Sequence, residues 1–141
     1  MISFFYTFIP VILGFIVSLF TDTSAYQNIN KPFNIPSIIF PIIWTIIYLA
    51  IGYASYRTSK DKPTFKLFYI NLAINLIWGF IFFNLGMYFN AFILILVMIF
   101  LEIILIIRYK KLDKVSYIIN IIYLLWLIFA AYLNLSIYIL N

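Results

Sequence analysis

The chain of 141 residues contains no cysteine and no histidine. The lack of thiols excludes disulfides and thiol catalysis, and the lack of imidazoles excludes Cys/His zinc sites, imidazole acid–base chemistry and a histidine ligand for haem iron. Acidic residues are also scarce. The four of them lie too far apart in the sequence to suggest a carboxylate metal site, so we expect no metal: Asp22, Asp61, Glu102 and Asp113.

Charge is scarce and apolar side chains are abundant. Only 9% of the residues are charged and 67% are hydrophobic, whereas a soluble domain is about half apolar and a quarter charged. A chain this short has too much surface for its volume to bury so many apolar side chains. The composition therefore excludes a water-soluble enzyme and predicts an integral membrane protein.

Long apolar runs predict an all-α bundle of five membrane-spanning helices in a single domain, residues 1–141. A helix needs about 20 mostly apolar residues to cross a bilayer. No run alternates polar and apolar residues as a barrel strand does, and a helix satisfies its own backbone hydrogen bonds in lipid. The predicted spans are about 2–20, 37–56, 67–85, 91–107 and 115–138.

Basic residues predict how the helices are oriented. The net charge is +5, and eight of the nine basic residues lie in the second and fourth connections, on the same side as the N-terminus. The positive-inside rule then places the N-terminus in the cytoplasm and the long first loop outside the cell. We therefore expect a multi-pass protein of the cytoplasmic membrane and no nucleic-acid partner. The eight residues are Arg57, Lys60, Lys62, Lys66, Arg108, Lys110, Lys111 and Lys114.

Aromatic and amide side chains recur at helical spacing in three of the predicted spans. Steps of three and four place them on one face of each helix. If these faces point inward, they enclose an aromatic cavity beneath the first loop, suited to a large, flat, mostly apolar ligand with polar edges. The candidate ligand-binding residues are Trp44, Tyr48, Asn75, Trp78, Tyr123, Trp126, Ala130 and Asn134.

A structural interpretation of the same residues stays open. Tryptophan and tyrosine anchor helices at membrane interfaces, and asparagine forms hydrogen bonds between helices. Trp126 fits the anchor interpretation least well, because it is about twelve residues from the outer end of its span, near the middle of the bilayer at about 1.5 Å per residue.

Glu102 is the only ionisable residue well inside a predicted span. Buried carboxyl groups in membranes are costly, so one reading is a small-solute or ion transporter that uses Glu102. The alternatives are a hydrogen-bonded helix contact or a side chain that reaches toward the side where Arg108 lies. We favour a structural role, because transporters usually show paired repeats or broken helices, which are not evident here.

Four short motifs lie along nearly the whole chain. They are Tyr26 with Lys31-Pro32 and Pro36, then Phe-Pro-Ile-Ile-Trp-Thr-Ile-Ile-Tyr at 40–48, Asn-Leu-Ile-Trp at 75–78, and Tyr-Leu-Leu-Trp-Leu-Ile-Phe-Ala at 123–130. In their order and spacing these motifs closely resemble the translocator protein family (TspO/MBR), also called tryptophan-rich sensory proteins or peripheral-type benzodiazepine receptors.

The resemblance implies a five-helix bundle that binds porphyrins or other haem-type tetrapyrroles, needs no further cofactor and often forms homodimers. It implies that Trp44, Asn75, Trp126 and Ala130 line the ligand pocket. It also implies that the first loop covers this pocket as a lid. This loop departs from the family pattern, because it lacks the usual tryptophan and is one residue shorter. The lid residues are Tyr26, Lys31, Pro32, Phe33 (in place of the tryptophan) and Pro36.

The leading functional prediction is a membrane receptor or carrier for tetrapyrroles. The resemblance implies an alternative, light-dependent degradation of protoporphyrin, in which Trp44 and Trp126 would be the catalytic residues. The sequence offers no acid–base constellation for ordinary catalysis. Whether the protein is an enzyme therefore stays open at the level of sequence.

Overall fold

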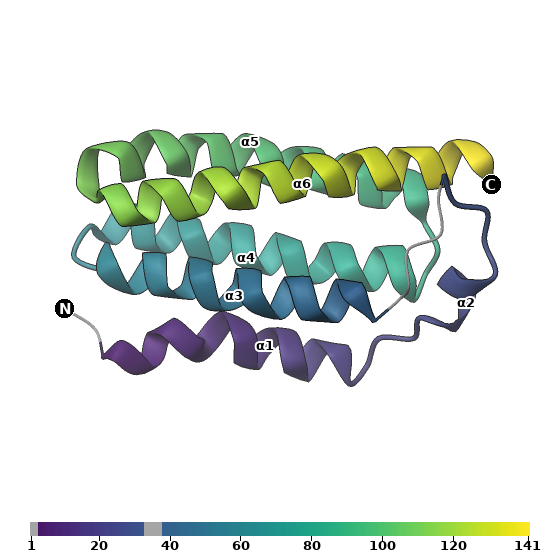
Figure 1. Cartoon of the computed structure of the whole chain (residues 1–141), viewed down its shortest axis with the longest axis horizontal. Helices are drawn as coiled ribbons and strands as arrows, with labels where there is room; N and C mark the ends of the chain where they lie inside the picture. The colour runs from purple at the N-terminus through teal and green to yellow at the C-terminus, as the bar shows by residue number, and fades with distance from the viewer. Residues whose placement is uncertain (1–2, 33–37) are drawn as a thin grey trace.

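The computed structural model describes residues 3–32 and 38–141, and all regular structure in these ranges is helical, without strands. Figure 1 shows the long helices side by side, with a shorter helix along one flank. In chain order the elements are a 3₁₀ helix η1 (Phe4–Phe8), α1 (Ile9–Ser18), the short α2 (Ser24–Gln27), α3 (Ile39–Arg57), α4 (Lys62–Phe83), α5 (Tyr88–Leu112) and α6 (Lys114–Leu140).

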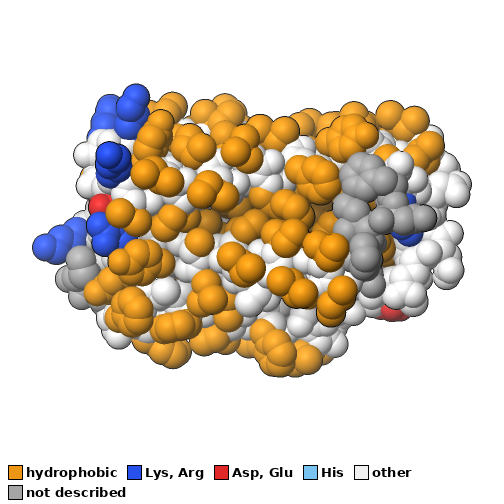
Figure 2. Space-filling view, in the orientation of Figure 1, with side chains coloured by type: hydrophobic (Ala, Val, Ile, Leu, Met, Phe, Trp, Pro, Cys, Tyr) orange, Lys and Arg blue, Asp and Glu red, His pale blue; other side chains and the backbone are white. Residues whose placement is uncertain are grey.

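Helices α3 to α6 are long and apolar enough to cross a membrane, with 19, 22, 25 and 27 residues. Apolar side chains cover most of the face seen in Figure 2, as expected for a surface solvated by lipid. The helices thus make this a multi-pass membrane protein in contact with the bilayer.

The first predicted span is shorter than expected. In place of one helix over 2–20, the described residues form η1 followed by α1, an apolar stretch of Phe4–Ser18. Pro10 lies in the first turn of α1. Proline has no backbone N–H to donate, so it fits at a helix start but not inside one. This explains why the stretch changes from 3₁₀ to α geometry near this residue.

Two other helices extend beyond their predicted bounds. Helix α4 begins at Lys62 rather than near 67, and α5 continues to Leu112 rather than ending near 107. Aspartates cap the starts of α4 and α6. Asp61 accepts a hydrogen bond from the backbone N–H of Thr64 at the start of α4, and Asp113 accepts one from that of Ser116 at the start of α6. Lysine and arginine are good helix formers, so charged residues assigned to the connections continue the helices beyond the apolar core.

The two ends of the bundle differ in charge. The α3–α4 and α5–α6 connections lie at one end together with the start of η1, whereas α2 and the α4–α5 turn lie at the other (Figure 1). We call the first the basic end, because Lys and Arg gather there (Figure 2), and the second the loop end.

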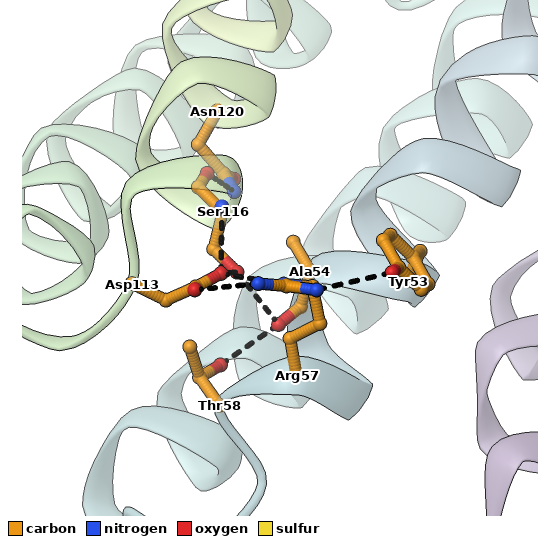
Figure 3. A network of polar contacts seen from close by, with 7 residues as sticks. All are labelled: Tyr53, Ala54, Arg57, Thr58, Asp113, Ser116 and Asn120. Atoms are coloured by element: carbon orange, nitrogen blue, oxygen red, sulfur yellow. Dashed lines mark hydrogen bonds and ion pairs between the residues drawn. The ribbon is translucent and has the colours of Figure 1, made fainter.

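At the basic end an ion pair joins α3 to the start of α6 (Figure 3). The Arg57 guanidinium donates from Nε and Nη2 to the two Asp113 oxygens at 2.8 and 2.9 Å, and from Nη1 to the Tyr53 hydroxyl at 3.1 Å. The Ser116 hydroxyl donates to the carbonyl of Ala54 at 3.2 Å. The hydrogen bonds from Arg57 and Ser116 hold the pKa of the Asp113 carboxyl well below its usual range, against the opposing effect of burial.

Candidate functional site: an aromatic hollow near the loop end

All three tryptophans of the chain meet between helices α3, α4 and α6. The ring centroid of Trp44 lies 5.9 Å from that of Trp78 and 5.9 Å from that of Trp126. Each indole comes from a different helix. The helical spacing of the aromatic and amide residues places them on one face of each helix, and these three faces point toward one another. The three rings thus form a single cluster.

The cluster borders an enclosed hollow of about 20 Å³, which is room for about one water molecule. The aromatic rings themselves occupy most of the space between the helices. The lining residues are almost all apolar: Tyr26, Phe40, Trp44, Trp78, Phe82, Phe83, Trp126, Phe129, Ala130, Leu133 and Asn134.

Tyr26, from α2 in the first loop, closes the hollow at the loop end. Its side chain is only 4% exposed and lies edge-on to the rings of Phe40 and Phe83, with centroids 5.8 and 5.6 Å away. Burial raises the pKa of its hydroxyl, so the phenol stays neutral. Lys31 holds this residue in place: its Nζ donates to the Tyr26 carbonyl at 2.7 Å and lies 4.6 Å from the ring centroid.

The remaining predicted lid residues contribute less to what the structure describes. Pro32 is half-buried and does not line the hollow. Phe33 and Pro36 lie outside the described residues. Nearby, the loop is tied to the end of α6, since the backbone N–H of Asn30 donates to Asn141 Oδ1 at 3.1 Å and Asn141 Nδ2 donates back to the Asn30 carbonyl at 2.9 Å.

The indole N–H groups of Trp78 and Trp126 have different environments. Trp78 Nε1 donates to Asn134 Oδ1 at 3.0 Å, and Asn134 Nδ2 donates to the Tyr88 carbonyl at 2.8 Å. By contrast, Trp126 Nε1 is buried and has no hydrogen-bond partner among the described residues. A buried donor without an acceptor costs free energy, so Trp126 offers the hollow an unused hydrogen-bond donor.

Three of the eight predicted ligand-binding residues do not reach the wall of the hollow. Tyr48, Asn75 and Tyr123 lie about one helical turn closer to the basic end than the tryptophans and bond to one another. The Tyr48 hydroxyl donates to Asn75 Oδ1 at 2.6 Å, and Asn75 Nδ2 donates to the Tyr123 hydroxyl at 2.7 Å. These bonds join α3, α4 and α6 beneath the hollow, as in the helix-contact interpretation of the amides.

The hollow also has lining residues that the sequence analysis did not select. They are Phe40, Phe82, Phe83, Phe129 and Leu133. Phe82 continues the four-residue spacing from Trp78, so periodicity was a usable signal for it. Phe129 lies three residues after Trp126, so helical spacing was a usable signal for it as well. Phe83 falls outside such spacing, and no sequence pattern distinguishes it from the other phenylalanines.

Glu102 lies away from the hollow, in the contact between α4 and α5. Its side chain is 1% exposed, and Asn71 Nδ2 donates to Oε2 at 3.4 Å. The side chain is therefore buried in the bundle and does not extend to the surface near Arg108. In the described part of the chain no group of three acidic side chains is close enough to hold a metal ion.

Comparisons with known proteins agree with this architecture. A sequence model described as the TspO/MBR family matches residues 6–140. The chain is 31% identical to the tryptophan-rich protein TspO of Archaeoglobus fulgidus, over 92% of this chain and 90% of that protein, and 29% identical to its namesake in Chlorobaculum tepidum, over 92% and 89%. It is 28% identical to the tryptophan-rich sensory protein of Cereibacter sphaeroides, over 77% and 72%. Because the family model matches nearly the whole length of the chain, the chain belongs to the TspO/MBR family.

Proposed function

We propose that this protein is a membrane receptor or carrier that binds a porphyrin or another tetrapyrrole in the aromatic hollow. One observation carries the proposal: tryptophans from three separate helices converge on one enclosed space that Tyr26 closes. Flat aromatic walls suit a flat aromatic ring, since stacked or edge-on rings gain about 0.5–1.5 kcal/mol per pair beyond the burial of apolar area.

The hollow also offers a means of orienting such a ligand. Its wall is apolar except at a few points, which is typical of sites for small organic molecules. The unpaired Nε1–H of Trp126 would donate to a polar edge of the ring. Ala130, with its small side chain, leaves space beside that indole on the same helix.

Binding requires the site to open. A tetrapyrrole is much larger than a space for one water molecule, so the rings of Tyr26, Phe40 and the tryptophans must separate to admit it. The bound form would then be a second conformation that the ligand stabilises by its own ring contacts. Tyr26 and Phe40 are the first candidates to move, because they join the loop end of α3 to the connection that precedes it.

The proposal is tested by titrating protoporphyrin with purified protein and following the porphyrin absorbance. Replacing Trp126 with alanine should weaken binding about tenfold or more, because it removes stacking area and the free N–H donor. Trp126→Phe keeps a ring and should weaken binding less. Phe100→Ala is the matched control, since Phe100 is 63% exposed on α5 and does not line the hollow. Equal affinity of Trp126→Ala and wild type would refute the site.

Light-dependent degradation of the bound porphyrin is the second candidate function. The observation that favours it is the contact between Trp44 and Trp126, which would place two oxidisable indoles next to the ligand. Loss of porphyrin absorbance under illumination should then be slower in Trp126→Phe than in wild type, at saturating protein. Equal rates in both proteins would refute a role for the Trp126 indole in the degradation.

The cellular setting belongs to the same proposal. We place the protein in the cytoplasmic membrane as a homodimer, with its basic end in the cytoplasm and the first loop as an external lid. The charge difference between the two ends supports this orientation. Analytical ultracentrifugation in detergent tests the dimer, and a single monomeric species across a wide protein concentration range would contradict it.

A further inference from the structure

A second concavity lies at the basic end, between the start of α4 and the last turns of α5. It has a volume of about 400 Å³, much larger than the aromatic hollow, and opens to the surface. We call it the basic groove. Its lining residues are Asp61 and Thr64 from the start of α4, with Ile104, Ile107, Arg108, Lys111 and Leu112 from α5.

The α5 side of the basic groove changes from apolar to basic along the helix. Ile104, Arg108 and Lys111 are spaced by four and three residues, so they share one face. Ile104 lies toward the membrane interior, and Lys111 lies at the end of the helix. A phospholipid presents its groups in the same order, with acyl chains inside and a phosphate at the surface. The groove therefore matches the depth profile of a lipid molecule.

Both cations of the basic groove are free to bind an anion. Within residues 3–32 and 38–141, neither Arg108 nor Lys111 has an ion-pair or hydrogen-bond partner, and the ion pair found there joins Arg57 to Asp113. Asp61, the acidic residue of the groove, is held by hydrogen bonds within its own helix start and pairs with neither cation. Its Oδ2 accepts from the backbone N–H of Thr64 at 3.3 Å and from the Thr64 hydroxyl, which caps α4.

We propose that the basic groove binds the headgroup of an anionic phospholipid. Arg108 and Lys111 contact the phosphate, and the acyl chains lie along Ile104 and Ile107. A guanidinium donates two parallel N–H groups to phosphate oxygens, which makes arginine well suited to this role. Basic pockets between membrane helices on the cytoplasmic side are sites where acidic headgroups bind. This site is separate from the aromatic hollow and does not depend on tetrapyrrole binding.

Native mass spectrometry of the full chain in detergent tests the proposal, with phosphatidylglycerol or phosphatidylcholine added. Wild type should retain phosphatidylglycerol preferentially. The double variant Arg108→Gln/Lys111→Gln should bind it about thirtyfold more weakly, because each of the two basic residues near a membrane surface contributes about 1 kcal/mol. The matched control is Lys60→Gln/Lys110→Gln, which removes the same charge from exposed positions of the basic end that do not line the groove.

Three outcomes would overturn the proposal. An equal loss of affinity in the control would indicate general attraction to a basic surface. Equal binding of phosphatidylglycerol and phosphatidylcholine would show that the groove does not recognise an anionic headgroup. Displacement of the lipid by an equal concentration of soluble glycerol phosphate would point to a site for free phosphate compounds. All four exchanged side chains are exposed, so thermal unfolding of the variants should match that of wild type.

Discussion

At the scale of single residues, close approach between helices limits what each position tolerates. Gly52 on α3 is buried against η1, and a Cβ atom built on it would lie 2.1 Å from the backbone carbonyl oxygen of Thr7. Gly52 follows Trp44 and Tyr48 at four-residue steps, so the three residues share one face of α3, but spacing does not show that another segment's backbone touches this glycine. That contact depends on how η1 packs, which is a property of the fold.

Replacing Gly52 with alanine should therefore destabilise the protein, by about 1–3 kcal/mol as for other overpacked sites. The added methyl group meets backbone, which cannot rotate away as a side chain does, so η1 must shift. Thermal unfolding in detergent measures the effect. Gly79→Ala is the control, because a Cβ there would meet no atom within 4 Å. Equal melting temperatures for the two variants would show that η1 moves freely on α3.

Asn134 is the second residue with a testable role. Its amide accepts from Trp78 and donates to the carbonyl of Tyr88, so it joins α6 to both α4 and α5. Replacing Asn134 with leucine should leave these groups unpaired and cost about 1–3 kcal/mol. The same change at Asn90, which is exposed on α5, should cost much less. A cost within a few tenths of a kcal/mol at Asn134 would show that other groups replace its hydrogen bonds.

At the scale of elements, the sequence predicted the number of apolar segments better than their ends. Hydropathy detects where a helix enters the apolar core of the bilayer but not where its hydrogen bonds stop. Asp61 and Asp113 mark the true starts of α4 and α6, because each caps the first turn of the helix that follows. Asp113 alone separates α5 from α6, so it also directs the chain into the next helix.

The pairing of Asp113 with Arg57 predicts a pH dependence of stability. Because the pKa of this carboxyl is lower in the folded than in the unfolded protein, the contribution is complete above the unfolded pKa of about 4 and is lost as the pH falls through the folded value. Asp113→Asn keeps a capping side chain but not the charge. Its melting temperature in detergent should be lower than that of wild type near pH 7, and the difference should disappear in strong acid. A constant difference at all pH values would refute the ion pair as its cause.

At the scale of the whole molecule, composition and charge predicted a helical membrane protein, and motif order predicted the family. The small volume of the aromatic hollow could not be predicted from the sequence. Spacing along each helix shows which face carries Trp44 or Trp126, whereas the distance between rings depends on how closely α3, α4 and α6 pack. Helix packing also decides which of the two predicted amides lines the hollow. Asn134 does, whereas Asn75 is hydrogen-bonded between Tyr48 and Tyr123.

The orientation of the bundle gives a prediction for the entire chain. Because the protein has no cysteine, a single introduced thiol is the only site for a maleimide reagent. Ser24→Cys at the loop end should react in intact cells with a reagent that cannot cross the membrane. Lys60→Cys at the basic end should react only after the membrane is disrupted. Both positions are exposed. The reverse labelling pattern would show that the orientation is opposite to the one that the positive-inside rule predicts.

The meeting of Trp44, Trp78 and Trp126 has a practical consequence. The chain has three tryptophans, and all of them line the same enclosed space. When the protein is excited at wavelengths that tryptophan absorbs and tyrosine does not, its intrinsic emission comes from this one place. The colour and lifetime of that emission thus report whether the rings stay together or separate, without any attached dye.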